Sequence, residues 1–112
     1  MGEPTRRIKG LGEIALRVAD LDAMQRFYQE VVGLELLGRF DHAAFFRIAD
    51  GYGGHTQVLA LFDRSGQAGY RGLDPERTTV DHLAFAIDLA DYGAEKARLD
   101  GLGVRVTLSA QA

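Results

Sequence analysis

The sequence predicts an α+β fold made of two related halves. With Glu13 aligned to His82, an offset of 69 residues places apolar positions of one strand-like run on apolar positions of another. In both halves a helix-like run follows, and then a glycine, Gly33 or Gly103, opens an alternating segment. Because a long internal repeat is strong evidence about architecture, we predict paired β-α-β-β-β modules, the second truncated after its second strand. The alternative is two unrelated strand–helix units that look alike.

The first module, about residues 8–63, has the order β-α-β-β-β. Side chains alternate in residues 13–18, which predicts a strand with one apolar face. Asp20 or Asp22 can cap the helix that follows, and Gly33 can end it in a left-handed conformation. The later strands are predicted at residues 34–40, 43–48 and 56–62, with a glycine-rich turn at 50–54.

The second module repeats this pattern only in part. Residues 64–79 hold three glycines and one proline among polar residues and predict a linker. The partial module, about residues 80–108, then has predicted strands at 82–87 and 104–108 and a helix at 91–102. We therefore treat residues 1–112 as one domain with an incomplete second half.

Composition excludes several classes of protein. The 112 residues suffice for one hydrophobic core. The net charge of −3 offers no broad basic surface for nucleic acid, and no apolar run is long enough to span a membrane or to act as a signal peptide. There is no cysteine, so any metal must be bound by nitrogen and oxygen ligands. We expect a cytoplasmic protein.

Four motifs carry a family resemblance: Glu13-Ile-Ala-Leu-Arg-Val-Ala-Asp-Leu, Phe27-Tyr28, Val32-Gly33-Leu34 and Asp81-His82-Leu-Ala-Phe-Ala-Ile-Asp. They resemble the vicinal oxygen chelate superfamily of glyoxalase I, bleomycin-resistance proteins, fosfomycin-resistance transferases and extradiol dioxygenases. The resemblance implies that two modules face each other and that their sheets curve into a cup around a divalent metal. It also implies that the substrate binds the metal through two neighbouring oxygens, and that the protein is a homodimer.

The resemblance also indicates metal ligands. Family ligands lie at the start of the first strand and on the last strand of each module, which implies Glu13 and His82. Imidazole and carboxylate both suit Zn²⁺, Ni²⁺, Mn²⁺ or Fe²⁺. The alternatives are that His82 is a structural histidine and that Glu13 forms an ion pair with Arg17, which shares its face of the strand.

The match fails on the fourth strand, where the family's ligand position falls on Ala60, which cannot bind a metal. Gln57 and His55 lie an odd number of residues from Ala60, so each points to the opposite face of the strand and cannot replace it. His42 belongs to a turn. We expect both of these histidines on the surface. The family's last carboxylate belongs to a hairpin that follows the final strand predicted here, so these residues offer at most two ligands where catalytic sites usually need three.

The remaining site residues follow from parity. Arg17 can anchor an anionic group of a substrate, its repeat equivalent Ala86 leaves room for one, and Ala60 faces the same space.

Two function classes stay open. In the first, His82, Glu13 and a carboxylate from beyond these residues hold an ion that acts as a Lewis acid in glyoxalase-like or dioxygenase-like chemistry. In the second, a metal-free protein of the bleomycin-resistance type sequesters a small molecule, and Ala60 favours this class. We also expect a homodimer, because a module without its last two strands leaves an unpaired edge.

Overall fold

The structure is a computed structural model that describes residues 6–107. The chain divides into two compact units, Met1–Leu73 and Asp74–Ala112, and this boundary falls inside the predicted linker. The first unit holds a four-stranded sheet with helices, and the second holds one longer helix. The predicted α+β class is confirmed.

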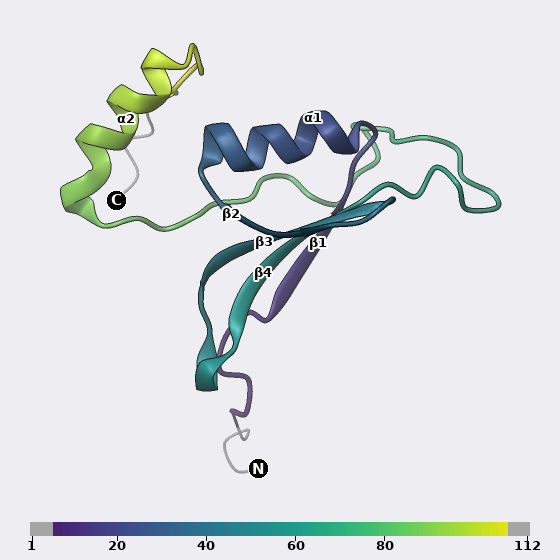
Figure 1. Ribbon diagram of the computed structural model, residues 1–112, viewed down its shortest axis with the longest axis horizontal. Coiled ribbons are helices and arrows are strands. Elements are labelled where there is room, and N and C mark those ends of the chain that lie inside the picture. Colours follow the sequence, from purple (N-terminus) through teal and green to yellow (C-terminus); the bar gives the residue numbers. More distant parts are fainter. Residues whose placement is uncertain (1–5, 108–112) are drawn as a thin grey trace. The chain divides into compact units, whose positions relative to one another are not determined.

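The sheet of the first unit has the order β1-β4-β3-β2 (Figure 1). Its strands are β1 (Glu13–Arg17), β2 (Glu35–Arg39), β3 (Ala43–Asp50) and β4 (Thr56–Phe62). The parallel pair β1–β4 joins the start of the module to its end, whereas β2–β3 and β3–β4 are antiparallel hairpins. The predicted β-α-β-β-β order of this unit is confirmed.

One helical segment connects β1 to β2. It begins with α1 (Leu21–Arg26) and continues as a π-helical stretch, Phe27–Val32. The Asp20 side chain caps it by accepting a 3.0 Å hydrogen bond from the Ala23 N–H, and Gly33 ends it in the left-handed region at φ 88°. Both predicted ends are therefore confirmed. A π stretch has wider turns than an α-helix, so its side chains are spaced differently around the axis, and Phe27 is 40% exposed.

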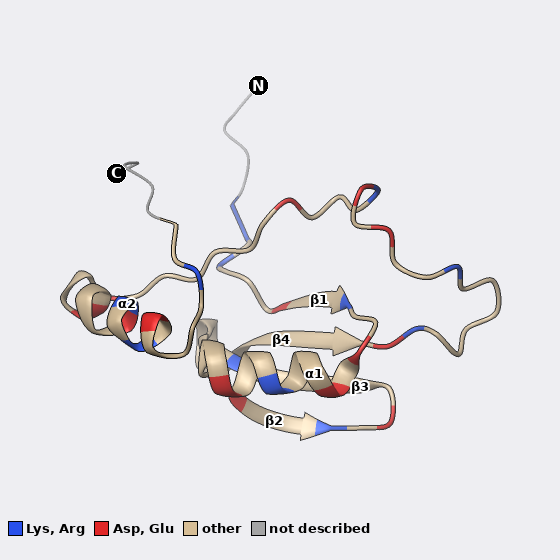
Figure 2. Cartoon of the chain, turned by 90° about the horizontal axis from the view of Figure 1, so that it is seen from above, with Lys and Arg blue, Asp and Glu red and all other residues tan. Residues whose placement is uncertain are grey.

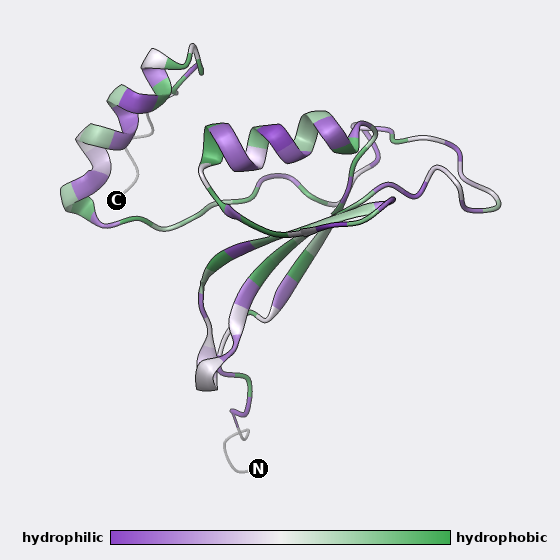
Figure 3. Cartoon of the chain, viewed as in Figure 1, coloured by the Kyte–Doolittle hydropathy of each residue, from purple (hydrophilic) through white to green (hydrophobic). Residues whose placement is uncertain are grey.

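The core of the first unit lies between this helical segment and the sheet. Figure 3 shows hydrophobic residues concentrated in the central strands. Phe46 on β3 and Leu59 and Leu61 on β4 are fully buried, and Leu21 of α1 is nearly so. The Tyr28 ring lies 6.0 Å from the Phe46 ring, centroid to centroid, and partial burial raises the pKa of its hydroxyl above the usual 10.0.

The second unit contains a short 3₁₀ turn, Leu89–Asp91, followed by α2 (Tyr92–Gly101). The predicted helix at 91–102 is thus confirmed. Partly exposed ion pairs line α2: Lys96 with Asp100, and Arg98 with Glu95, whose hydrogen bond from Arg98 lowers the pKa of the Glu95 carboxyl.

Both strands predicted for the second unit are wrong over the described residues, because 82–87 and 104–107 form neither strand nor helix. Leu108, the last residue of the second predicted strand, lies outside the described residues. In the first unit β1 is held by parallel pairing to β4, whereas residues 74–107 of the second unit form no strand that could pair in this way. An alternating pattern selects a face, but a strand also needs a partner for its backbone hydrogen bonds.

None of the helices in residues 6–107 is both long and apolar enough to cross a membrane.

Candidate functional site

The helical segment covers only one face of the sheet in the first unit. Register partners in a sheet point to the same side, so pairing identifies the uncovered face. We call this uncovered side the open face, and three rows of register partners cross it. The first row is Glu35, Arg47, Val58 and Glu13, the second is Gly38, Phe45, Ala60 and Ala15, and the third is Ala43, Phe62 and Arg17. On β1, Glu13, Ala15 and Arg17 are exposed, in agreement with this orientation.

Aromatic side chains dominate one part of the open face. The Phe45 ring lies 5.8 Å from Phe62 and 5.8 Å from Phe40, centroid to centroid, and both contacts are edge-to-face. The Arg64 guanidinium lies 4.2 Å above the Phe62 ring, a cation–π distance. Ala60 lies beside Phe45 in the register and is fully buried. The face therefore has an apolar floor of small and aromatic groups.

Charged groups stand at both ends of β1, acidic at its start and basic at its end (Figure 2). Glu13 and Arg17 are these groups, and neither forms an ion pair with another described residue, so the predicted alternative of a Glu13–Arg17 pair is not formed. Arg47 is engaged instead, because it pairs with Asp50 and donates a 3.3 Å hydrogen bond to Thr56 Oγ1. Arg17 is thus a cation of this face that is open to a ligand.

The predicted metal ligands are divided between the two units. Glu13 lies at the start of β1 in the first unit, whereas His82 and Ala86 belong to the second unit. The His82 ring is 79% exposed, and its Nδ1 lies 2.7 Å from Asp81 Oδ2. Each compact unit therefore carries one of the two predicted donors.

A catalytic divalent metal usually needs three protein ligands. At the fourth-strand position Ala60 has a methyl group and no donor, and its register partner on β1 is Ala15. No group of three or more histidine, aspartate or glutamate side chains in residues 6–107 is arranged to hold a metal ion. On β4 the described residues thus offer no ligand at the position that the resemblance implies.

Two cavities that the sequence did not predict lie at the ends of the sheet. One of about 580 Å³ lies where β4 ends and includes Phe62, Arg64 and His42. Another lies where β1 and β4 begin and includes His55. Both histidines are exposed, as predicted, but each lines a cavity. Only the fold shows that these turn residues meet the strand ends.

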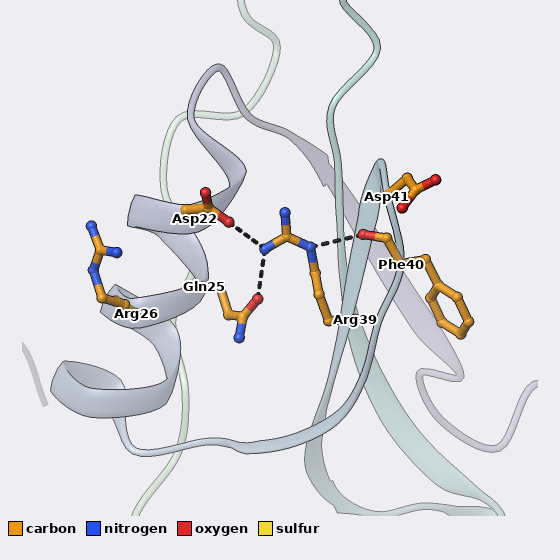
Figure 4. A pocket seen from close by; sticks show the side chains of 6 residues that line it. All are labelled: Asp22, Gln25, Arg26, Arg39, Phe40 and Asp41. Carbon is orange, nitrogen blue, oxygen red and sulfur yellow. Dashed lines mark hydrogen bonds and ion pairs between the residues drawn. The ribbon is translucent and has the colours of Figure 1, made fainter.

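A third cavity, of about 530 Å³, lies between α1 and the end of β2 (Figure 4). Arg39 occupies its centre: Nη1 donates to Asp22 Oδ1 at 2.7 Å and to Gln25 Oε1 at 2.8 Å, and Nε donates to the Phe40 carbonyl at 2.8 Å. The guanidinium is therefore committed to partners within the chain. We call these contacts of Arg39 with Asp22, Gln25 and Phe40 the clasp, and we interpret it as a link that holds α1 to β2.

Comparison with known proteins decides the family. The profile of the Glyoxalase/Bleomycin resistance protein/Dioxygenase superfamily matches residues 10–111. The chain belongs to this superfamily. The resemblance seen in the sequence is thereby confirmed.

Solved structures of the superfamily agree in fold. A lactoylglutathione lyase from Agrobacterium tumefaciens is 27% identical, with a TM-score of 0.61 over 89% of this chain and 75% of that one. A glyoxylase/bleomycin resistance protein/dioxygenase domain from Frankia sp. EAN1pec is 31% identical, with a TM-score of 0.57 over 90% of this chain and 79% of that one. A possible glyoxalase from Bacillus cereus, at 24% identity, shares the fold, with a TM-score of 0.56 over 86% of this chain and 76% of that one. No curated protein matches the chain.

Proposed function

We propose that this superfamily member binds a small organic molecule on the open face and that binding needs no resident metal. The proposal rests on Ala60. This residue has a methyl group where the family can have a metal ligand, and it shares the floor of the open face with Phe45 and Phe62. A floor of aromatic and small apolar groups with a few polar groups at its margin is typical of small-molecule sites.

The face favours a planar apolar molecule that carries a negative group. Aromatic rings stack on or pack edge-to-face against flat ligands. Arg17 is exposed at the end of β1, and its guanidinium can donate two parallel hydrogen bonds to a carboxylate. Ala86, its repeat equivalent, belongs to the second unit, and its predicted role in substrate binding stays a prediction.

The test is an NMR titration of the protein in excess EDTA with benzoate and with 1-naphthoate. The proposal expects chemical-shift changes at Ala15, Phe45, Ala60 and Phe62, with the larger ring binding more tightly. Arg17→Gln should weaken 1-naphthoate by about fivefold to tenfold, the loss of one charge-assisted hydrogen-bonded contact. Arg71→Gln, an exposed loop arginine of the same unit, is the matched control and should change nothing.

A metal-dependent enzyme of the glyoxalase or dioxygenase type is the second candidate. It is favoured by Glu13 and His82, which bear donor groups at equivalent positions of the repeat. Elemental analysis of protein purified without chelator tests it. Stoichiometric Zn²⁺, Ni²⁺, Mn²⁺ or Fe²⁺ that is lost in His82→Ala with the fold intact would support this candidate over metal-free binding.

We also propose a homodimer that works in the cytoplasm, as the sequence led us to expect. In the sheet order β1 and β2 are the edge strands, and each has one side without a partner among the described residues. Such edges favour pairing with another chain. Sedimentation should give twice the chain mass at tens of micromolar, and a monomer at that concentration would contradict the proposal.

A further inference from the structure

A cavity of about 340 Å³ lies away from the aromatic part of the open face, where β1 and β4 begin. It belongs wholly to the first unit, since every residue lining it precedes Asp74. The residues that line it are Arg7, Lys9, Gly10, Leu11, Gly12, Gly51, Tyr52, His55 and Thr56. We call this space the basic cavity.

The charged residues that line the basic cavity are all basic. Arg7 and Lys9 line it together with His55, and no aspartate or glutamate does, although the chain as a whole carries a net charge of −3. Neither Arg7 nor Lys9 forms an ion pair with another described residue. An anion that binds between two unpaired cations reduces the repulsion between them.

The nearest carboxylate on β3 does not neutralise these cations. Asp50 directly precedes the turn that lines the cavity, but its side chain is paired with Arg47. The same Arg47 guanidinium donates to Thr56 Oγ1, which places that hydroxyl in a fixed position at the cavity wall. Asp50 is thus held by a cation of the sheet and forms no ion pair with Arg7 or Lys9.

The wall on the turn side is tightly built. The Gly51 N–H donates to the His55 carbonyl at 2.7 Å, and the His55 N–H donates to the Tyr52 carbonyl at 3.2 Å. A Cβ on Gly51 would lie 3.0 Å from the His55 carbonyl oxygen, so only glycine fits there without a shift. The Tyr52 ring, 66% exposed, and Leu11 add apolar surface to the lining.

We propose that the basic cavity binds the phosphate group of a small soluble phosphate monoester, a function separate from ligand binding on the open face. Arg7 and Lys9 supply charge-assisted hydrogen bonds to the phosphate oxygens, and the Thr56 hydroxyl supplies a neutral one. Tyr52 and Leu11 contact the organic part of the ligand. The volume lies at the small end of the range for organic ligands, roughly 300 to 1,000 Å³, which suits a compact monoester.

The two lysines of the chain make a direct test possible. Lys9 lines the cavity and Lys96 lies on α2, so each protein molecule carries its own reference amine. The intact protein is acetylated at limiting reagent and constant ionic strength, and modification is read by peptide mass spectrometry. Phenyl phosphate should slow acetylation of Lys9 but not of Lys96, and inorganic phosphate should do so more weakly.

Three results would overturn the proposal. The first is equal modification of Lys9 with and without phenyl phosphate. The second is equal protection by benzoate at the same ionic strength, which would show a general anion effect. The third is protection by vesicles of an anionic phospholipid but not by phenyl phosphate, which would assign the cations to a lipid surface.

Variants give an independent measurement by NMR titration with phenyl phosphate. Lys9→Gln and Arg7→Gln should each weaken binding by about fivefold to tenfold, while Lys96→Gln, with the same change of charge, leaves it unchanged. Gly10→Leu should also weaken binding by filling the space, since a Cβ at Gly10 meets no atom within 4 Å and the fold can accept it. Unchanged affinity in Lys9→Gln and Gly10→Leu would contradict the site.

Discussion

Ala60 on β4 is the register partner of Ala15 on β1, so two methyl groups lie side by side on the open face. Glu13 lies two residues before Ala15 and points to the same side. The carboxylate at the start of β1 thus has no second donor beside it on β4. This relationship sets the chemistry of the face, because a floor without donors favours apolar contact over metal binding.

Ala60→Glu should strengthen metal binding at the open face. A carboxylate at this position lies on the same face as Glu13, and two carboxylates bind Zn²⁺ or Mn²⁺ better than one. We expect the variant to bind Zn²⁺ at least about tenfold more tightly by calorimetry, and Zn²⁺ to raise its Tm. Ala60→Leu adds similar bulk without a donor and serves as the control. Equally tight Zn²⁺ binding by the unmodified protein would contradict this interpretation.

Phe46→Ala should strongly destabilise the first unit. The Phe46 side chain is fully buried between the helical segment and the sheet, so truncation leaves a cavity. The expected loss in the free energy of unfolding is about 3 to 5 kcal/mol, measured by urea titration with circular dichroism. Leu37→Ala, at a half-exposed position beside the irregularity in β2, should cost about 1 kcal/mol or less. Similar losses in the two variants would argue against the assigned core.

Arg39→Met should loosen the clasp between α1 and β2. Arg39 donates to Asp22, Gln25 and the Phe40 carbonyl, but the pair with Asp22 is partly exposed, so we expect a loss of only about 1 kcal/mol. Arg26→Met, an exposed arginine of α1 that points away from this cluster in Figure 4, is the matched control. Urea titration of both variants measures the difference, and its absence would show that the clasp contributes nothing to stability.

Stability should fall as the pH rises above 10, in part because of Tyr28. Burial raises the pKa of its hydroxyl in the folded state, so the unfolded chain loses this proton first. The folded state therefore loses stability between the ordinary pKa of 10.0 and its own higher pKa. Tyr28→Phe should reduce this alkaline loss in thermal melts, whereas Tyr52→Phe, at an exposed position, should retain it. The same alkaline loss in both variants would contradict the assignment.

The first module could be predicted from sequence because its signals are local. Alternation places the strand at β1, Asp20 and Gly33 give the two ends of the helical segment, and glycines give the turn before β4. Each of these features depends on the conformational preferences of a few neighbouring residues.

The second module could not be predicted in the same way. Residues 82–87 repeat the apolar pattern of β1, yet they form no strand, because a strand depends on a hydrogen-bonding partner that the local pattern does not report. The repeat alone therefore did not determine the conformation of the segment.

The candidate site could be predicted only in part. Parity placed Glu13, Arg17 and Ala60 on one face, and the register of β1 with β4 agrees. The cluster of Phe40, Phe45 and Phe62 could not be foreseen. It depends on the pairing of β3 with β4 and on the turn between β2 and β3, which brings Phe40 to Phe45. The basic cavity likewise joins residues about 45 positions apart that meet only in the fold.

The most direct test of metal-free binding on the open face is chemical-shift mapping of 1-naphthoate with excess EDTA present. We predict saturable shifts at Ala15, Phe45, Ala60 and Phe62, with the same affinity whether EDTA or Zn²⁺ is present. Binding that disappears with EDTA and returns with Zn²⁺, or shifts confined to residues outside the open face, would contradict it.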